Sequence, residues 1–145
     1  MKENEPGIKV GVGAVVFRGG EVLVIRRGKA PFKGKWSIPG GGLLYEERLE
    51  DAVRREVAEE TGVEIAIGGL IGVFEALPRE TGQDGHVVMV DYWAEWIAGA
   101  PVAGDDAAEA EFAPLETALS RVCWDVTRTA IASAAKLRNT ARTKP

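Results

Sequence analysis

The chain has 145 residues, of which 46% are apolar and 28% are charged, and its formal net charge is −4. These values are typical of one globular domain, residues 1–145, with a substantial core. The negative charge argues against general nucleic-acid binding, and no apolar run approaches the roughly 20 residues that cross a membrane. The single cysteine, Cys123, excludes an intrachain disulfide. Because the first residues lack the apolar stretch of a signal peptide, a soluble cytoplasmic protein is expected.

The first half of the chain begins with a predicted β-hairpin. Residues 8–17 alternate between apolar side chains on one face and smaller ones on the other, which predicts a strand. Gly19 and Gly20 form a tight turn, and residues 21–26 form the partner strand. After a loop, a helix is expected to begin near Glu46 or Glu47 and to stop at Gly62.

The second half of the chain mixes strands, loops and helices. The expected elements are two strands within residues 63–76, separated at Gly68 and Gly69, a polar loop over 78–85, a strand over 86–96, a loop over 99–111, a short helix with Pro114 in its first turn, and an amphipathic helix over 121–139. Cys123 is expected on the apolar side of the last helix, as inert core. This order suggests an α/β protein, a three-layer α/β/α sandwich around a mixed sheet.

The most informative stretch is residues 39–63, PGGGLLYEERLEDAVRREVAEETGV. On a helix, Glu56, Glu59 and Glu60 gather on one face, where like charges repel one another. Such a cluster makes most sense around a hard divalent cation with oxygen ligands, such as Mg²⁺. The preceding glycines let the backbone approach that cation, or a phosphate, closely. A solvated acidic face is the alternative, but the whole pattern G-x5-E-x7-R-E-(apolar)-x-E-E-x-G-(apolar) is present without a gap.

This pattern resembles the Nudix box, the signature of the MutT-like Nudix hydrolases. The resemblance implies the same α/β/α fold and Mg²⁺-dependent cleavage, with Mn²⁺ able to substitute, of a nucleoside diphosphate linked to another group. It also implies metal ligands. Glu56 and Glu60 are expected to bind the cation directly, Glu59 directly or through water, and Gly40 through its backbone carbonyl.

The same resemblance implies further roles in catalysis. Glu47 and Arg55 are expected to brace the loop against the helix, which requires Glu47 to lie in the loop or the first bent turn, because eight helical residues span about 12 Å. One of Glu56, Glu59 or Glu111 is expected to help deprotonate the attacking water. Glu111 is the preferred late carboxylate in the acidic segment 105–111, ahead of Asp106, and a solvated loop is the alternative for this segment.

A basic segment leads into the box. Residues 26–35 contain no acid and carry five positive charges, Arg26, Arg27, Lys29, Lys33 and Lys35. Such a positively charged segment suits the binding of a polyphosphate, so Arg26, Arg27 and Lys35 are predicted to bind substrate. The sequence RRGKAPFKGKWSIPGGG resembles the ADP-ribose pyrophosphatase-like branch of the family. Leu44 and Glu46 depart from a common form of the box, which has an acid and a glycine at these places.

Aromatic residues and the single histidine are candidates for binding the rest of a substrate. Phe74, His86, Tyr92 and Trp93 could contact a base, although aromatic residues in strands more often belong to the core. Trp36 is expected in the core rather than in a substrate wall.

The predicted function is hydrolysis of ADP-ribose or a related NDP-sugar within its diphosphate. A house-cleaning pyrophosphatase for nucleoside triphosphates is the first alternative, and a non-catalytic nucleotide-binding module is the second. The predicted partner is a small nucleoside diphosphate derivative, with no nucleic acid and no membrane, and a homodimer is possible.

Overall fold

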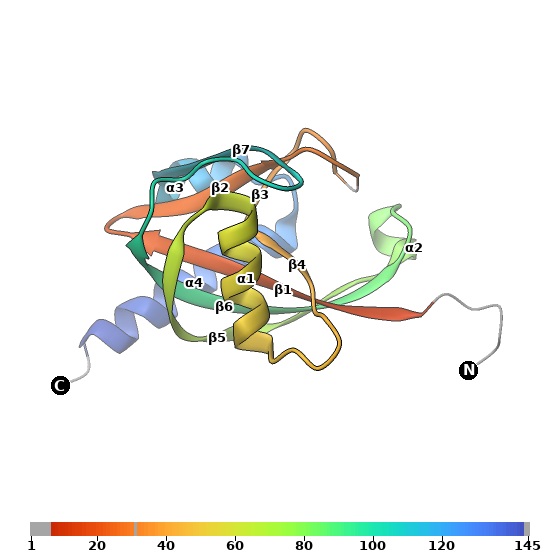
Figure 1. Ribbon diagram of the computed structural model, residues 1–145, viewed down its shortest axis with the longest axis horizontal. Coiled ribbons are helices and arrows are strands. Elements are labelled where there is room, and N and C mark those ends of the chain that lie inside the picture. The colour runs from red at the N-terminus through yellow and green to blue at the C-terminus, as the bar shows by residue number, and fades with distance from the viewer. Residues whose placement is uncertain (1–6, 31, 144–145) are drawn as a thin grey trace.

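The computed structural model describes residues 7–30 and 32–143, whose elements alternate between strands and helices (Figure 1). The elements are β1 (Ile8–Arg18), β2 (Glu21–Arg27), β3 (Trp36–Ser37), β4 (Gly40–Gly42), α1 (Leu49–Thr61), β5 (Glu64–Ala76), α2 (Pro78–Thr81), β6 (His86–Ala98), β7 (Ala107–Pro114), α3 (Leu115–Arg121) and α4 (Asp125–Thr143). No helix in the described ranges is long and apolar enough to cross a membrane.

The strands form one mixed sheet with the order β3-β2-β1-β6-β5, in which β4 also pairs with β1 and β7 with β2. Strands β1 and β6 run parallel, and the other pairs are antiparallel. Strand β1 changes its partner along its length. Its residues 11–13 pair with β4, whereas Phe17 and Arg18 pair with β2. The sheet therefore forks at β1.

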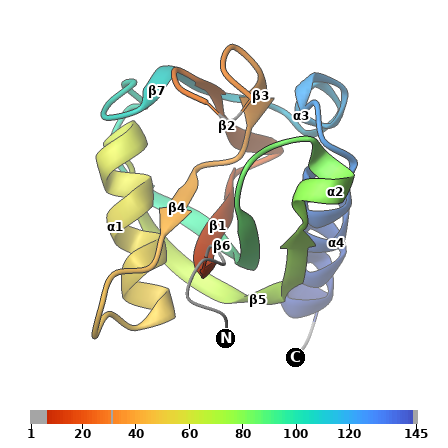
Figure 2. The same ribbon diagram turned by 90° about the vertical axis from the view of Figure 1, so that its right-hand side faces the viewer.

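Helix α1 covers one face of this sheet, and α3 and α4 cover the other (Figure 2). The alternation along β1 explains both layers. Val12, Ala14 and Val16 belong to the core cluster under α1, whereas Val15 and Phe17 belong to the cluster under α3 and α4. The predicted α/β/α sandwich around a mixed sheet is confirmed.

Several predicted boundaries were wrong. Residues 64–76 form one strand with bulges instead of two strands, and Gly68 is there for space, since a Cβ atom would lie 2.4 Å from the Trp93 ring. The polar loop 78–85 contains α2. The predicted loop 99–111 contains the start of β7. The strand was not recognised because its alternating alanines and glutamates include few large apolar residues.

The predicted helix 121–139 is interrupted. Its first residue, Arg121, is the last residue of α3, and α4 begins only at Asp125. Between them, Val122 bridges to Trp36 and the Cys123 N–H donates to the Trp36 carbonyl at 3.4 Å, so the chain is drawn toward β3. Cys123 is exposed in this connection, and its expected place in the core was wrong.

The apolar side of the last helix also differs from the expected one. Leu137 is 39% exposed, whereas Arg138 is buried. Arg138 donates hydrogen bonds of 2.7 and 2.9 Å to Glu95 on β6, and its guanidinium lies 4.5 Å from the centre of the Phe17 ring. A partly buried ion pair thus holds α4 against the sheet where a leucine was predicted.

Candidate active site

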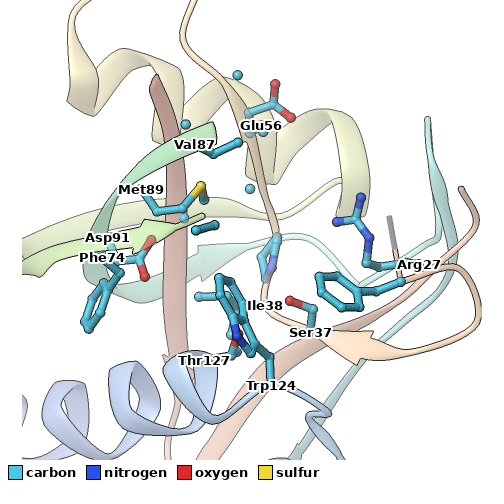
Figure 3. A pocket seen from close by; sticks show the side chains of 18 of the residues that line it. Arg27, Ser37, Ile38, Glu56, Phe74, Val87, Met89, Asp91, Trp124 and Thr127 are labelled. Carbon is cyan, nitrogen blue, oxygen red and sulfur yellow. The ribbon is translucent and has the colours of Figure 1, made fainter. Parts of the chain in front are cut away.

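A cavity of about 410 Å³ opens where the sheet forks (Figure 3). Both branches of the fork line it, through Ile25 of β2 and Gly40 of β4, together with α1, β6 and the segment before α4. Figure 3 shows Glu56 at one end and Trp124 at the other, with Arg27 facing Asp91 across the space between them. The cavity therefore joins an acidic end to an aromatic end.

Arg55 fastens the loop before α1 to the helix. It donates hydrogen bonds to both carboxylate oxygens of Glu47, at 2.7 and 2.9 Å, and another at 3.0 Å to the Gly42 carbonyl. Hydrogen bonds from Arg55 lower the pKa of Glu47. Glu47 lies in the loop because α1 begins only at Leu49, later than predicted. Arg55 and Glu47 thus connect the helix to the loop through an ion pair.

Glu60 is buried at the acidic end of the cavity, with 5% of its surface exposed. Its Oε1 accepts a hydrogen bond of 2.8 Å from the Gly40 N–H. The pKa of Glu60 is raised to about 7, mainly by burial and also by the negative charges of Glu56 and Asp105, whereas the Gly40 N–H and Arg27 lower it. The site therefore holds negative charge that the protein only partly compensates.

Glu56 lies beside Glu60 and lines the cavity, held by a 2.7 Å hydrogen bond from Arg55. A Cβ atom at Gly41 would lie 2.4 Å from the Glu56 carboxylate, so only glycine permits this approach of the turn to the helix. Glu59 takes a different position. Its side chain is 45% exposed and pairs with Arg55 at 3.3 Å, and it is absent from the cavity lining.

The carboxylates at the acidic end suit a hard divalent cation. Within the described ranges, no three His, Cys, Asp or Glu side chains already stand together as a metal site. The donor chemistry nevertheless fits, because two carboxylate residues, Glu56 and Glu60, line one cavity. A cation there would neutralise the charge that burial makes costly for Glu60.

The acidic segment after β6 contributes a different residue from the one predicted. Asp105 and Asp106 line the cavity, whereas Glu111 lies on β7 outside the lining and pairs with Arg121 of α3. Backbone hydrogen bonds fix this segment, since Gly104 N–H donates to the Glu60 carbonyl at 2.9 Å. Asp105 is the late carboxylate whose charge raises the pKa of Glu60, whereas Asp106 pairs with Lys29.

Most of the predicted basic segment does not face the cavity. Arg27 lines it. Arg26 pairs with Glu109 at 2.7 Å, and Lys29 pairs with Asp106 at 2.8 Å, so these charges are compensated by the acidic segment. Lys35 is exposed and lies outside the lining.

The aromatic end also differs from expectation. Of the four predicted base contacts, only Phe74 lines the cavity. Tyr92 and Trp93 pack into the two core clusters, and His86 lies outside the lining, although both of its chain neighbours belong to it. Trp36 packs against the core, as expected.

Three of the cavity residues that sequence reasoning missed carry chemistry of interest. Phe32 and Trp124 line it, with ring centres 6.0 Å apart and an interplanar angle of 28°. Asp91 lines it from β6 and is 5% exposed. The acid within an apolar strand, MVDYWA, was the available signal for Asp91, whereas Trp124 was predicted to lie inside a helix.

An α/β/α sandwich that folds a glycine turn against a carboxylate-bearing helix is the architecture expected of a Nudix hydrolase. Residues 7–132 match the NUDIX domain family, and the chain belongs to it. Nudix hydrolases generally use divalent metal ions.

Individual relatives agree with this assignment. The chain is 37% identical over 116 residues to an "ADP-ribose pyrophosphatase" of Methanocaldococcus jannaschii, covering 80% of this chain and 67% of that protein. A MutT NUDIX hydrolase of Burkholderia pseudomallei has a similar structure, with a TM-score of 0.74, 29% identity and coverage of 88% and 98%. The NUDIX domain of Shewanella oneidensis NrtR, complexed with ADP ribose, gives a TM-score of 0.76, 26% identity and coverage of 91% and 89%. The family and the pyrophosphatase relative support a pyrophosphohydrolase.

Proposed function

We propose that the protein hydrolyses the diphosphate of an NDP-sugar, with ADP-ribose as the preferred substrate. One observation carries the proposal: a single cavity joins the acidic end at Glu56 and Glu60 to the aromatic end at Phe74 and Trp124. The acidic end suits a diphosphate with its cation, and the aromatic end suits a base. A volume of about 410 Å³ lies within the usual range for small-molecule sites.

Mg²⁺ is the proposed cation, and Mn²⁺ is expected to substitute. Glu56 and Glu60 would hold it, with the Gly40 carbonyl and Glu59 as further ligands. When bound, it would neutralise the charge of the diphosphate. Arg27, which lines the same cavity, contributes a second positive charge toward the diphosphate.

In the proposed reaction, water attacks one phosphorus and the bridging P–O bond breaks, which yields AMP and ribose 5-phosphate. Asp105 is our candidate for accepting the water's proton, because it lines the cavity and is not one of the carboxylates assigned to the cation. Glu111, the late carboxylate predicted from the sequence, is replaced in this proposal, since it pairs with Arg121 outside the cavity.

The comparisons support this choice of substrate. The Methanocaldococcus jannaschii relative is named an ADP-ribose pyrophosphatase, and the Shewanella oneidensis domain is complexed with ADP ribose.

A hydrolysis panel tests the proposal. Purified protein with Mg²⁺, with Mn²⁺ or with EDTA is incubated with ADP-ribose, NADH, other NDP-sugars, dinucleoside polyphosphates and nucleoside triphosphates. We expect metal-dependent release of AMP from ADP-ribose with the highest kcat/KM. Fast pyrophosphate release from a triphosphate, without AMP release from ADP-ribose, would support the house-cleaning alternative instead. No hydrolysis of any compound would favour a binding module.

A further inference from the structure

The carboxylate of Asp91 is buried in the cavity wall. The side chain is 5% exposed, and Oδ1 has no hydrogen-bond partner among the described residues. Burying a carboxylate oxygen without a hydrogen bond costs free energy, so the position demands an explanation. The catalytic arrangement proposed above does not use this residue.

The neighbouring strand makes room for this carboxylate. Asp91 on β6 is in register with Gly13 on β1. A Cβ atom at Gly13 would lie 2.4 Å from Asp91 Oδ1, so any side chain there would collide with the carboxylate. Both residues line the cavity. Gly13 thus leaves space for a carboxylate whose Oδ1 has no hydrogen-bond partner in the described part of the chain.

The surroundings of Asp91 indicate what kind of ligand could reach it. Phe74, Met89 and Trp124 line the same region of the cavity, and Figure 3 shows the carboxylate beside Phe74, across from Arg27. Aromatic rings and a thioether favour a flat heterocycle over a sugar. A carboxylate can only accept hydrogen bonds when ionised, so the group that meets it must be a donor.

We propose that Asp91 determines base specificity by accepting a hydrogen bond from an amino group on the edge of the substrate's base. The inference rests on the proposed function for the placement of the diphosphate at the acidic end. It then follows that the base lies toward Phe74 and Trp124 with its amino edge at Asp91. Bases that present only acceptors at this edge are rejected, because they leave the buried carboxylate unpaired.

The test compares two ligand pairs that differ in one amino group. The first pair is ADP-ribose and its analogue with purine in place of adenine, measured as kcat/KM. The second is AMP and purine riboside 5′-monophosphate, measured as Kd by calorimetry, which needs no turnover. For the unchanged protein we expect the amino compound to be preferred about 10- to 100-fold in both measurements, as for hydrogen bonds to charged groups.

Three variants locate the source of that preference. Asp91→Leu removes the acceptor, and the preference is expected to fall to about threefold or less. Asp91→Asn keeps the shape and a neutral acceptor, so it should retain an intermediate preference. Asp84→Asn is the matched control, because Asp84 lines the same cavity but is exposed, and its preference should equal that of the unchanged protein.

The outcomes separate this inference from the proposed function. One outcome is that the protein cleaves ADP-ribose but both Asp91 variants keep its preference for the amino compound. That outcome would overturn the inference and leave the proposed function standing. If ADP-ribose is not cleaved but the preference for AMP depends on Asp91, the proposed function is wrong and the inference stands. If the Asp91 variants instead lose discrimination against 2′- or 3′-deoxy-AMP, the carboxylate binds the ribose and the inference is wrong. Asp91→Asn decides the question if Asp91→Leu does not fold.

Discussion

Arg55 and Glu47 are joined by two parallel hydrogen bonds of 2.7 and 2.9 Å between the helix α1 and the loop before it. This fork-to-fork contact is the strongest geometry available to an arginine and a carboxylate. The same guanidinium also reaches Glu56 at 2.7 Å and the Gly42 carbonyl at 3.0 Å. One side chain therefore sets the spacing between the glycine turn and a proposed cation ligand.

Arg55→Lys should lower kcat about 10- to 100-fold, because an ammonium group cannot hold three partners in one plane and small misplacements at a reacting centre are costly. KM and kcat on the best substrate are the measurements. Arg54→Lys is the control, since Arg54 is exposed and pairs only with Glu50 and Asp51 among the ion pairs found in the described ranges. Equal kcat values for the two variants would contradict the proposed role of Arg55.

Glu60→Gln should lower kcat about a hundredfold or more, since it removes a charge from the proposed cation site. The fold should persist, because the amide can still accept the hydrogen bond from the Gly40 N–H. Steady-state kinetics and thermal unfolding without metal provide both readouts. Glu50→Gln, in the exposed first turn of the same helix, should change neither. A folded Glu60→Gln protein with normal turnover would exclude Glu60 as a ligand.

Arg27→Ala should raise the KM for the diphosphate substrate about tenfold, because a charge-assisted contact at the cavity is lost. Lys35→Ala serves as the matched control, since Lys35 comes from the same basic segment but is absent from the cavity lining. The sequence alone predicted that both variants would weaken binding. If KM rises only in Lys35→Ala, then Lys35 contacts the substrate and Arg27 does not, which contradicts the placement of Arg27 in the cavity lining.

Asp91 should make the stability of the free protein depend on pH. Burial raises the pKa of Asp91 to about 6 from an ordinary value of 3.8. Because the folded state favours the protonated form, Asp91 contributes to the free energy of unfolding. This contribution is complete below about pH 4 and is lost as the pH rises through 6. The loss amounts to about 2–3 kcal/mol by pH 8.

Denaturant unfolding of the unchanged protein and Asp91→Asn, from pH 4 to pH 8, measures this effect. As the pH rises, the free energy of unfolding of Asp91→Asn should increase relative to that of the unchanged protein. Taking the difference cancels the titration of Glu60, which is common to both proteins. A difference that stays constant with pH would show that the Asp91 carboxylate is solvated or paired in solution.

The sequence was enough to predict the elements whose pattern is local. The box from Gly41 to Val63, the first hairpin and the strand at 86–96 all follow from spacing within one segment. The sandwich followed from their order together with the family resemblance.

Properties that depend on distant neighbours could not be predicted in the same way. Arg26 looked uncompensated because its partner, Glu109, comes from a strand paired with β2 much later in the chain. Asp91 looked like one polar residue in an apolar strand, since nothing local shows that β1 places a glycine beside it. Trp124 lines the cavity from the break between α3 and α4, where one continuous helix was predicted.

The carbonyl end of α1 is fastened to the segment that carries Asp105. The Val102 N–H donates to the Thr61 carbonyl and the Gly104 N–H to the Glu60 carbonyl, each at 2.9 Å. Gly104 permits this approach, because a Cβ atom there would lie 2.6 Å from the Glu59 carbonyl. Two backbone hydrogen bonds thus connect the end of the helix directly to the segment that carries Asp105. A sequence change in this segment would act directly on the backbone of Glu60, so the proposed proton acceptor and the proposed cation ligand are expected to vary together in evolution.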